Sequence, residues 1–488
     1  MIDSTIKEKL ELVYQKHVSN YVELICVERL SGGASQETYR IEIKTSNGNL
    51  SHALRRSAGG EIAEVTAEHP GLGTEAMLID AAKKAQVPVP DIYYVLQDED
   101  QLGAGFIMAW LEGETLGARI VRSDKYKTLR NGLAAECGRL LARIHAIDLD
   151  DSKLREQLTE VSPKEFVEQI WEKYQALETP QPMIDYTARW LLGHLPDNFE
   201  SCLVHNDFRN GNLMVSEEKV VAVLDWELAH IGDPMRDLGW ICVNSWRFGS
   251  TQPVGGFGEY EELFQAYELE SGKPLNRKSV KFWEVFGSFW WSVGCLGMAE
   301  HYRNGPDQSV ERPAVGRRSS ECQIDCVNLL IPGRVTSLEP LSNKSLDDAD
   351  QLPMSLELLE SVIEFLRDDI VPSTEGRNQF LSRVSANSLA IVKRELQLGS
   401  LARKNEKNRL QGIFYLKTDL ESDLENDLET NSIDDRKELR WRLTNALRDR
   451  SQSLDDKALQ NHLRQTVFDQ VSIDQPQYSG LEASKHFH

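Results

Sequence analysis

Two apolar runs that each end in a carboxylate constrain this chain more than any other feature of its sequence. They stand in LVHNDFRNGNLMV and, a few residues later, in VLDWELAHIGDP. Asn212 follows Asp207 by five positions, and Asp225 ends the second run. The letters LMVSEEKVVAVLD between them predict a hairpin with strands over residues 213–215 and 220–224. Such a hairpin brings a polar loop to the end of a buried strand.

These three side chains have the chemistry that phosphoryl transfer to a hydroxyl requires. The reaction asks a protein to position its reactants, to bind Mg²⁺ through hard oxygen ligands and to accept the proton of the hydroxyl. Asp207 can face the acceptor hydroxyl, while Asn212 faces the metal ion and Asp225 binds it from the other side. The alternative is that Asp207 and Asp225 only form turns at strand ends. The spacing and the intervening Asn212 favour the metal site.

The composition limits the class of protein. The 488 residues carry a formal net charge of −22, and an acidic chain is a poor general binder of nucleic acid or anionic membranes. Seven cysteines without a CxxC pair are typical of a reducing compartment. The first residues, MIDSTIKEKLELVYQKH, lack the apolar core of a signal peptide, and the run VFGSFWWSVGCLGMA is too short to span a bilayer. We therefore expect a soluble cytoplasmic protein with neither nucleic acid nor membrane among its partners.

Local patterns divide the chain into a sheet-rich first part and helices thereafter. The runs ELICVERL, ETYRIEIKT, LSHALRRS, IYYVLQD and GFIMAWLEG predict strands, and Asn47-Gly48 predicts a hairpin. No βαβ repetition is visible, which argues against a Rossmann domain. Beyond Glu112, apolar residues recur at helical spacing. The expected segments are an N-terminal helix (1–20), a sheet-rich part (21–110), a mainly helical part (111–335), a linker (336–352), a helical C-terminal domain (353–480) and a tail (481–488).

The separated motifs HNDFRNGN, LDWE and GDPMRDLGW resemble those of the aminoglycoside phosphotransferase and choline kinase-like family. Within that family, the chain is most similar to kinase-like domains that occur alone in bacteria or fused to acyl-CoA dehydrogenases. The resemblance covers roughly residues 20–335. It implies an α+β, bilobal protein-kinase-like fold, with a small antiparallel-sheet N-lobe and a mainly helical C-lobe. An all-α C-terminal domain follows, where NSLAIVKRELQLG resembles a helical domain of unknown function.

Carried over residue by residue, the resemblance implies the same roles for the opening stretch. Asp207 matches the catalytic base, and Asn212 and Asp225 match the Mg²⁺ ligands. Arg209 either positions the base or meets a phosphate; an ordinary surface charge is the alternative. The resemblance also implies that Asp237 braces the catalytic loop from the helix that follows it.

The resemblance further implies that the sheet-rich part binds ATP. In the family, a Gly-rich turn lies over the phosphates, a strand supplies a phosphate-binding Lys, and a helix supplies the Glu that pairs with it. The matching residues are Gly32, Gly33 and Ser35 in LSGGASQET, Arg55 in ALRR, Glu75 in GTEAMLI, and Met108 and Trp110 in FIMAWLEG, whose backbone groups would meet adenine. An ordinary surface ion pair is the alternative for Arg55 and Glu75.

Three departures from the family pattern stand out. Asn206 occupies the position between His and Asp where Gly is usual. Arg55 replaces the usual Lys, and a guanidinium is a planar fork rather than a point charge. No G-x-G-x-x-G motif is present, so the turn SGGAS gains weight only from its place between two strands.

The sequence thus predicts an ATP- and Mg²⁺-dependent phosphotransferase that acts on a hydroxyl of a small molecule. An anionic acceptor is expected because several arginines fall in the helical part: Arg209, Arg236, Arg247, Arg303, Arg317 and Arg318. The resemblance implies a hydroxyacyl-CoA or a related hydroxy acid. The alternatives are a catalytically idle nucleotide-binding scaffold and an antibiotic phosphotransferase for aminoglycosides or macrolides. The C-terminal helical domain is expected to pack against the kinase-like part or to mediate self-association.

Overall fold

The computed structural model describes residues 4–30, 36–60, 69–340, 353–415 and 433–487. The chain packs into two compact units, each assembled from two stretches of sequence. The first unit comprises Met1–Pro163 with Pro196–Glu284, and the second comprises Lys164–Leu195 with Val285–His488. Gly32, Gly33 and Ser35 lie outside the described residues, as does most of the expected linker.

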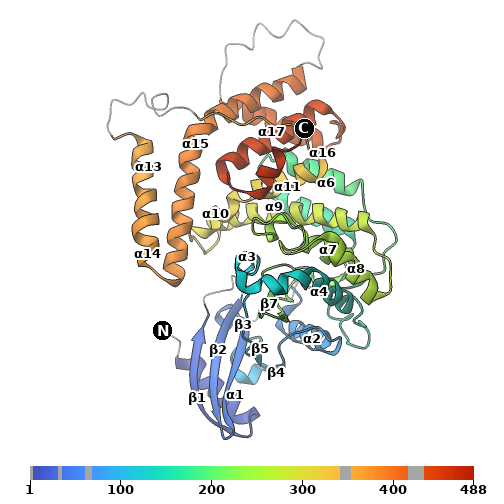
Figure 1. Ribbon diagram of the computed structural model, residues 1–488, viewed down its shortest axis with the longest axis vertical. Coiled ribbons are helices and arrows are strands. Elements are labelled where there is room, and N and C mark those ends of the chain that lie inside the picture. The colour runs from blue at the N-terminus through green and yellow to red at the C-terminus, as the bar shows by residue number, and fades with distance from the viewer. Residues whose placement is uncertain (1–3, 31–35, 61–68, 341–352, 416–432, 488) are drawn as a thin grey trace. The chain divides into compact units, whose positions relative to one another are not determined.

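A five-stranded antiparallel sheet forms the N-terminal part of the first unit (Figure 1). Its strands are β1 (Tyr21–Arg29), β2 (Gln36–Thr45), β3 (Gly48–Ser57), β5 (Gly105–Ala109) and β4 (Ile92–Val95), in the spatial order β1-β2-β3-β5-β4. Gly48 has a φ of +127°, a backbone conformation that L side chains rarely adopt. The hairpin predicted at Asn47-Gly48 therefore joins β2 to β3, with Thr45 paired to Gly48.

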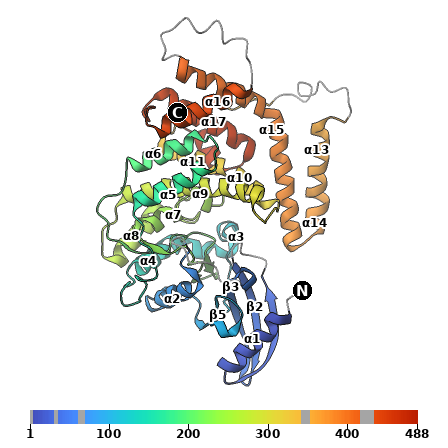
Figure 2. The same ribbon diagram turned by 180° about the vertical axis from the view of Figure 1, so that it is seen from behind.

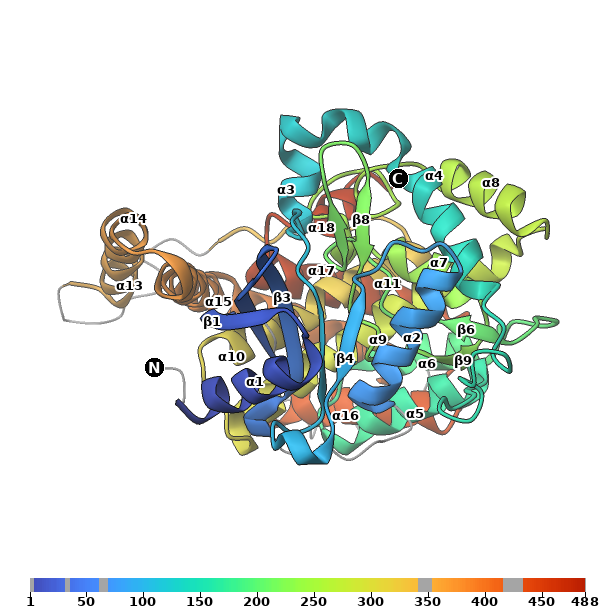
Figure 3. The ribbon, with the colours of Figure 1, turned by 90° about the horizontal axis from the view of Figure 1, so that it is seen from below.

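One face of this sheet is covered by helix α1 (Ser4–His17), as Figures 2 and 3 show. Every second residue of β2 is buried, and Ile41 and Ile43 are fully excluded from solvent. They share a core with Leu10 and Val13 of α1. Fully burying a side chain of this kind contributes about 1.5–3 kcal/mol, so the alternation along β2 fixes which face of the sheet receives the helix.

The remainder of the first unit is mainly helical, with two short strand pairs, β6–β9 and β7–β8, that carry the polar loops. Its elements are α2 (Gly71–Lys84), α3 (Gly117–Arg122), α4 (Lys127–His145), β6 (Cys202–Val204), β7 (Leu213–Val215), β8 (Val220–Val223), β9 (His230–Gly232), α7 (Met235–Ile241) and α8 (Tyr260–Ser271). The hairpin predicted from the sequence is β7–β8. Helices α4 and α8 pack closely at Gly138, where a Cβ atom would lie 2.4 Å from the Leu263 carbonyl oxygen. Only glycine permits this approach.

The second unit is all-helical within the described residues. Its elements are α5 (Pro163–Ala176, from Lys164 on), α6 (Pro182–Leu192), α9 (Arg277–Asn304, from Val285 on), α10 (Glu311–Arg317), α11 (Ser319–Leu330), α13 (Ser355–Glu364), the π-helix η5 (Phe365–Ile370), α14 (Val371–Ser373), α15 (Gly376–Tyr415), α16 (Ile433–Arg448), α17 (Lys457–Asp474) and α18 (Ser479–Ser484). Helices α13 and α15 lie side by side as a hairpin (Figure 2). No helix in these stretches combines the length and apolar character needed to cross a membrane.

The core of the second unit joins segments that are far apart in the sequence. Met183 and Tyr186 of α6 pack with Leu443 of α16 and with Leu463 and Phe468 of α17. Helix α6, which precedes the Asp207 loop in the chain, therefore shares a core with the C-terminal helices. The expected fold class, an α+β kinase-like fold followed by a helical C-terminal region, is confirmed, while the six-segment division of the chain stays a prediction.

Asp185 forms a buried polar centre in this core. Its carboxylate is fully buried and accepts hydrogen bonds from Trp171 Nε1 at 2.9 Å, Tyr174 Oη at 3.0 Å and Arg448 Nε at 2.9 Å. Burial raises the pKa of Asp185, although the bonds from Arg448 and Trp171 oppose this shift. One carboxylate thus ties α5 and α6 to α16.

Asp185→Ala is expected to reduce the free energy of unfolding by about 3–5 kcal/mol, because it leaves the Arg448 guanidinium in the core without its carboxylate. Denaturant unfolding followed by circular dichroism measures the change. Glu482→Ala is the control, since the exposed Glu482 pairs only with its helix neighbours Lys485 and His486. Equal stability of Asp185→Ala and the control would show that the buried cluster is not structural.

Candidate active site

Asp207 lies on the loop between β6 and β7. Its carboxylate accepts three hydrogen bonds. Its Oδ1 atom accepts from Trp240 Nε1 at 2.8 Å and from Arg209 Nε at 3.0 Å. Its Oδ2 atom accepts from Asn212 Nδ2 at 2.5 Å. Asp207 is 8% exposed, so it is largely shielded from bulk water while its orientation is fixed. A carboxylate held in this way can orient a hydroxyl group that approaches it.

Asn212 is held at the other end of the same loop. Its side-chain Nδ2 atom also donates to the backbone carbonyl oxygen of Asp207 at 3.0 Å. The backbone carbonyl oxygen of Asn212 accepts from the Leu224 N–H at 2.9 Å. The amide nitrogen of the Asn212 side chain is therefore used within the loop, and its Oδ1 atom is the one left to meet a cation. The bond to Leu224 joins the loop to the end of β8, directly before Asp225.

Asp225 follows the hairpin and has a φ of +67°. A non-glycine residue in this left-handed region is uncommon, and aspartate is among the residues that tolerate it. The Asp225 side chain is 30% exposed, and its Oδ1 atom accepts a hydrogen bond from Arg55 Nη2 at 2.6 Å. The structure therefore brings Asp207, Asn212 and Asp225 to one place, as the sequence spacing predicts.

The residues at this place fit a magnesium ion. Asn212 Oδ1 and the Asp225 carboxylate are hard oxygen donors, and Mg²⁺ is typically bound by one or two carboxylates together with water and substrate phosphates. Within the described stretches, no cluster of three or more His, Cys, Asp or Glu side chains is arranged to hold a metal ion. The donor set therefore resembles a site that is completed by phosphates rather than an all-protein cage.

Three carboxylates surround the Arg55 guanidinium of β3. Its Nε atom lies 3.2 Å from Glu75 Oε1, and its Nη2 atom lies 2.6 Å from Asp225 Oδ1 and 3.6 Å from Glu227 Oε2. Burial would lower the pKa of Arg55, but the neighbouring Glu75 and Asp225 raise it overall. The predicted Arg55–Glu75 pair is thus present, with Glu75 buried and the Arg55 side chain 17% exposed. Three carboxylates around one guanidinium leave an excess of negative charge, which favours the arrival of a cation.

Glu75 on α2 is the most perturbed carboxyl group of this cluster. Complete burial, with Asp225 and Glu227 nearby, raises the pKa of Glu75 to about 7, although Arg55 opposes the shift. A carboxyl group with such a pKa changes its charge near neutral pH. The charge balance around Arg55 therefore depends on pH in the nucleotide-free protein.

Asn206 adopts the backbone conformation that explains why glycine is usual at its position. Its φ is +66°, in the left-handed region that glycine enters freely and asparagine tolerates. Its Oδ1 atom accepts from Arg236 Nε at 2.9 Å, and its Nδ2 atom donates to the Leu228 carbonyl oxygen at 3.2 Å. Asn206 thus keeps the turn and adds two side-chain hydrogen bonds that glycine lacks.

The buried Asp237 carboxylate supports the loop from α7. It accepts the backbone N–H of Asn206 at 2.7 Å and of His205 at 2.8 Å, and His145 Nε2 donates to it at 3.1 Å. Burial alone would raise the pKa of Asp237, but the bond from His145 and the backbone bonds lower it. The bracing contact that the family resemblance implies is therefore present.

Two tryptophans have polar roles that the sequence does not reveal. The pattern predicts Trp240 as core, and it is indeed buried, but its Nε1 atom donates to Asp207. Trp246 lies under Arg209, with the guanidinium carbon 4.4 Å from the ring centroid. The available signal was the position of Trp240, one helical turn after Asp237, which places both on the α7 face next to the loop.

The backbone groups of Met108 and Trp110 face β3. The Trp110 N–H donates to the Ser51 carbonyl oxygen at 3.3 Å, and Met108 pairs with Ala53 in the same ladder. Because alternate residues of a strand turn their backbone groups to opposite sides, Ala109 faces the other way, and its N–H donates to Asp91 at 2.8 Å. The backbone groups of Ala109 therefore face away from β3, and the adenine contacts expected at Met108 and Trp110 stay a prediction.

The arginines that favoured an anionic acceptor are engaged within their own units. Arg209 and Arg236 belong to the catalytic loop network already described. The others make ion pairs, which are Arg247 with Glu284 at 3.0 Å, Arg303 with Glu300 at 3.3 Å, Arg317 with Asp474 at 2.7 Å and Arg318 with Glu321 at 3.2 Å. These pairings reduce the positive charge on which that expectation relied.

Residues 27–275 match the model of the phosphotransferase enzyme family, about half of the chain. The kinase-like fold agrees with this match. The chain belongs to the phosphotransferase enzyme family, and the expected resemblance is confirmed. Residues 372–478 match a second model, described only as a domain of unknown function.

The curated relatives are larger proteins. The chain is 29% identical to mouse acyl-CoA dehydrogenase family member 10, over 56% of this chain and 26% of that protein. It is 25% identical to mouse acyl-CoA dehydrogenase family member 11, over 75% of this chain and 48% of that protein. The chain thus spans about half or less of the length of these relatives.

A solved structure supports the fold. A Ralstonia eutropha protein assigned to the aminoglycoside phosphotransferases superposes with a TM-score of 0.54 and 24% identity, covering 65% of this chain and 95% of that one.

Substitutions of Asn206 separate backbone strain from side-chain bonding. Asn206→Gly loses the bonds to Arg236 and Leu228, and we expect it to reduce the free energy of unfolding by about 1–3 kcal/mol. Asn206→Ala loses the same bonds and places a Cβ at positive φ, which should destabilise by roughly 1 kcal/mol more. Urea denaturation should show the free energy of unfolding decreasing from the wild type to Asn206→Gly and then to Asn206→Ala. An alanine variant as stable as the glycine variant would exclude backbone strain at this position.

Glu75 predicts a pH-dependent stability of the nucleotide-free protein. Its pKa is about 7 in the folded state against an ordinary 4.5, so the folded state binds the proton more tightly. Its contribution to the free energy of unfolding is therefore present at low pH and declines as the pH rises toward 7. Urea denaturation between about pH 5 and about pH 8 should show this decline in the wild type relative to Glu75→Gln. A difference between the two proteins that does not vary with pH would contradict the prediction.

Proposed function

We propose that this chain is an ATP- and Mg²⁺-dependent phosphotransferase that phosphorylates a hydroxyl group of a small molecule. The observation that carries the proposal is the convergence of Asp207, Asn212 and Asp225, joined by hydrogen bonds across the β7–β8 hairpin. These residue types provide one carboxylate for the acceptor hydroxyl and two oxygen donors for a cation. Membership of the phosphotransferase enzyme family supports the same reaction class.

In this proposal Asp207 orients the acceptor hydroxyl and accepts its proton. The donors on its carboxylate hold it in one rotamer, which serves a reaction that depends mainly on positioning. Arg209, fixed between Asp207 and the Trp246 ring, lies where it can offer its remaining N–H groups to the transferred phosphoryl group. Asn212 and Asp225 would hold the metal ion, which when bound neutralises the negative charge of the nucleotide phosphates.

ATP would lie along the sheet of the first unit. Arg55 is proposed to exchange part of its contact with Asp225 for the phosphates while Glu75 keeps it in place, and Gly32, Gly33 and Ser35 remain the proposed phosphate-covering turn. For adenine we shift the proposed contacts from Met108 and Trp110 to the carbonyl oxygen of Ala109 and the N–H of Leu111. The ladder turns these groups away from β3.

The proposed acceptor is a hydroxyacyl-CoA or a related hydroxy acid. Its support is the similarity to proteins named as acyl-CoA dehydrogenase family members. An aminoglycoside acceptor is the second candidate, supported by the Ralstonia structure. The two acceptors differ in charge, and direct comparison of turnover decides between them.

Asp207→Ala is expected to lower kcat by about 10²–10⁴-fold, since it removes the group that meets the hydroxyl proton. Asn212→Ala and Asp225→Ala should instead raise the Mg²⁺ concentration needed for half-maximal activity. ATP consumption is measured with hydroxy acids, their CoA thioesters and aminoglycosides, and Asp150→Ala, an exposed change, is the control. Transfer that survives Asp207→Ala would refute the assigned role, and nucleotide binding without turnover on any acceptor would favour an idle scaffold.

A further inference from the structure

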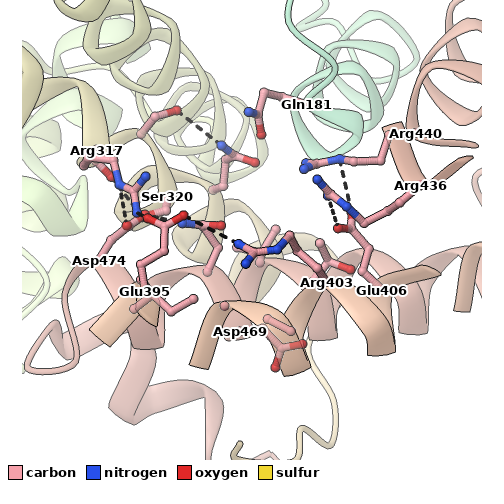
Figure 4. A pocket seen from close by; sticks show the side chains of 18 of the residues that line it. Gln181, Arg317, Ser320, Glu395, Arg403, Glu406, Arg436, Arg440, Asp469 and Asp474 are labelled. Carbon is pink, nitrogen blue, oxygen red and sulfur yellow. Dashed lines mark hydrogen bonds and ion pairs between the residues drawn. The ribbon is translucent and has the colours of Figure 1, made fainter. Parts of the chain in front are cut away.

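The second unit contains a polar pocket that is independent of the proposed catalytic site. It has a volume of about 260 Å³, and the described residues that line it include five arginines and four carboxylates from α10, α15, α16 and α17. Figure 4 shows Arg436 and Arg440 extending toward Glu406, and Arg403 extending toward Glu395, whose Oε1 atom lies 3.7 Å from Arg403 Nη1. Ionised side chains rarely gather in the interior of a helical domain without a partner or a ligand.

The charges are unevenly distributed along this pocket. At one end Arg317 is balanced by Asp474 at 2.7 Å and by Glu395 at 2.6 Å. At the other end two guanidinium groups share one carboxylate, since Glu406 lies 2.6 Å from Arg436 Nη1 and 3.1 Å from Arg440 Nε. Two arginines on one carboxylate leave a net positive charge there. The Arg440 Nε and Glu406 Oε1 atoms lie within ion-pair distance but are not aligned as a hydrogen bond, so both polar atoms keep hydrogen-bonding capacity.

Unsatisfied donors are found at the same end. The Nε atoms of Arg409 and Arg440 are buried and make no hydrogen bond to the described residues, although Arg440 Nε lies 3.1 Å from Glu406 Oε1 and Arg409 pairs through Nη2 with Asp469 at 3.1 Å. Glu406 itself is 4% exposed, so water does not readily compensate for the missing acceptors. Buried donors of charged groups that lack an acceptor are expensive, and an anion would satisfy them.

The neighbouring His462 reports the sign of the local field. It is 1% exposed, and neither ring nitrogen has a hydrogen-bond partner within the part of the chain that the structure describes. Burial lowers its pKa, and the positive charges of Arg409 and Arg440 lower it further. A histidine kept neutral in this way adds no positive charge beside Arg409 and Arg440.

We propose that this pocket binds a phosphate group, either inorganic phosphate or a small phosphomonoester, between Arg436, Arg440 and Arg403. Guanidinium groups match the oxygens of phosphate with paired hydrogen bonds, and a dianion balances the positive end of the pocket. The hydroxyl and amide groups of Ser319, Gln323 and Gln181 also line the cavity. They give the remainder of a phosphomonoester polar partners.

The test is calorimetric titration of the full-length chain, prepared in phosphate-free buffer at constant ionic strength, with inorganic phosphate and separately with glycerol 3-phosphate. Wild-type protein is expected to bind saturably. Arg440→Gln and Arg436→Gln are expected to bind about tenfold more weakly or worse, because each removes a charge-assisted bond. Arg440→Lys keeps the charge but loses the planar guanidinium, so its phosphate affinity is expected to lie between those of the wild type and Arg440→Gln. Circular dichroism melts confirm that each variant is folded.

Two control variants place the binding in the second unit. Arg377→Gln changes an exposed arginine that pairs with Glu311 outside the pocket. The phosphate affinity of this variant should equal that of the wild type. Arg55→Gln changes the arginine proposed to meet ATP phosphates, and phosphate binding should persist in it. Binding of glycerol 3-phosphate that competes with phosphate identifies the phosphomonoester, and binding of phosphate alone identifies the free ion.

Other results overturn the proposal. Absence of saturable binding by wild-type protein would show that the arginines form only an internal ion-pair network. Binding that is unchanged in folded Arg436→Gln and Arg440→Gln proteins would place the anion elsewhere. Binding lost only in Arg55→Gln would assign it to the nucleotide site. The pocket variants Arg436→Gln, Arg440→Gln and Arg440→Lys change residues of the second unit, whereas Asp207, Asn212 and Asp225 belong to the first, so their outcome is independent of the proposed phosphotransfer.

Discussion

The loop that carries Asp207 depends on one buried carboxylate. Asp237 receives the backbone N–H groups of His205 and Asn206 and the Nε2–H of His145, so a single side chain fixes both the start of the loop and the helix α4 beside it. Backbone donors in a left-handed turn point the same way and would otherwise lack acceptors. Because Asp237 of α7 holds the turn through these backbone groups, the side chains of Asp207 and Asn212 are not needed to stabilise it.

The surroundings of Arg55 concentrate opposite charges at one point of the candidate site. The guanidinium holds Glu75, Asp225 and Glu227 together, although three carboxylates repel one another. Arg55 and a metal ion would compete for Asp225, and the excess of negative charge means that the cation relieves repulsion as it enters. The fork of an arginine suits this arrangement better than lysine, because it contacts several carboxylates at once.

The sequence predicts the parts of the site that are encoded by short spacings. Asp207, Asn212 and Asp225 fall on one loop and its hairpin, so their approach follows from local geometry. The partners that come from tertiary packing could not be read in this way. Trp240 reads as a core residue until its indole is seen beside Asp207, and the left-handed backbone of Asn206 resolves a departure that sequence alone leaves open.

Strand parity and long-range assembly set the other limits. Which of two adjacent residues turns its backbone toward β3 depends on the pairing partner, so the adenine contacts expected at Met108 and Trp110 stay a prediction. The arginine-lined pocket draws on helices separated by more than a hundred positions, and no local motif announces it. The same is true of the bond between Asp185 and Arg448.

The packing of α6 has a consequence for how such chains can change during evolution. Met183 and Tyr186 precede the catalytic loop in the sequence, yet their neighbours Leu443 and Phe468 belong to the last helices. A gene divided at the segment around residue 345 would yield an N-terminal product with an uncovered apolar helix and a C-terminal product with a hole in its core. Loss of the C-terminal domain therefore demands mutations that replace the apolar surface residues of α6. Recombination at that segment is tolerated only when the new domain packs against the apolar face of α6.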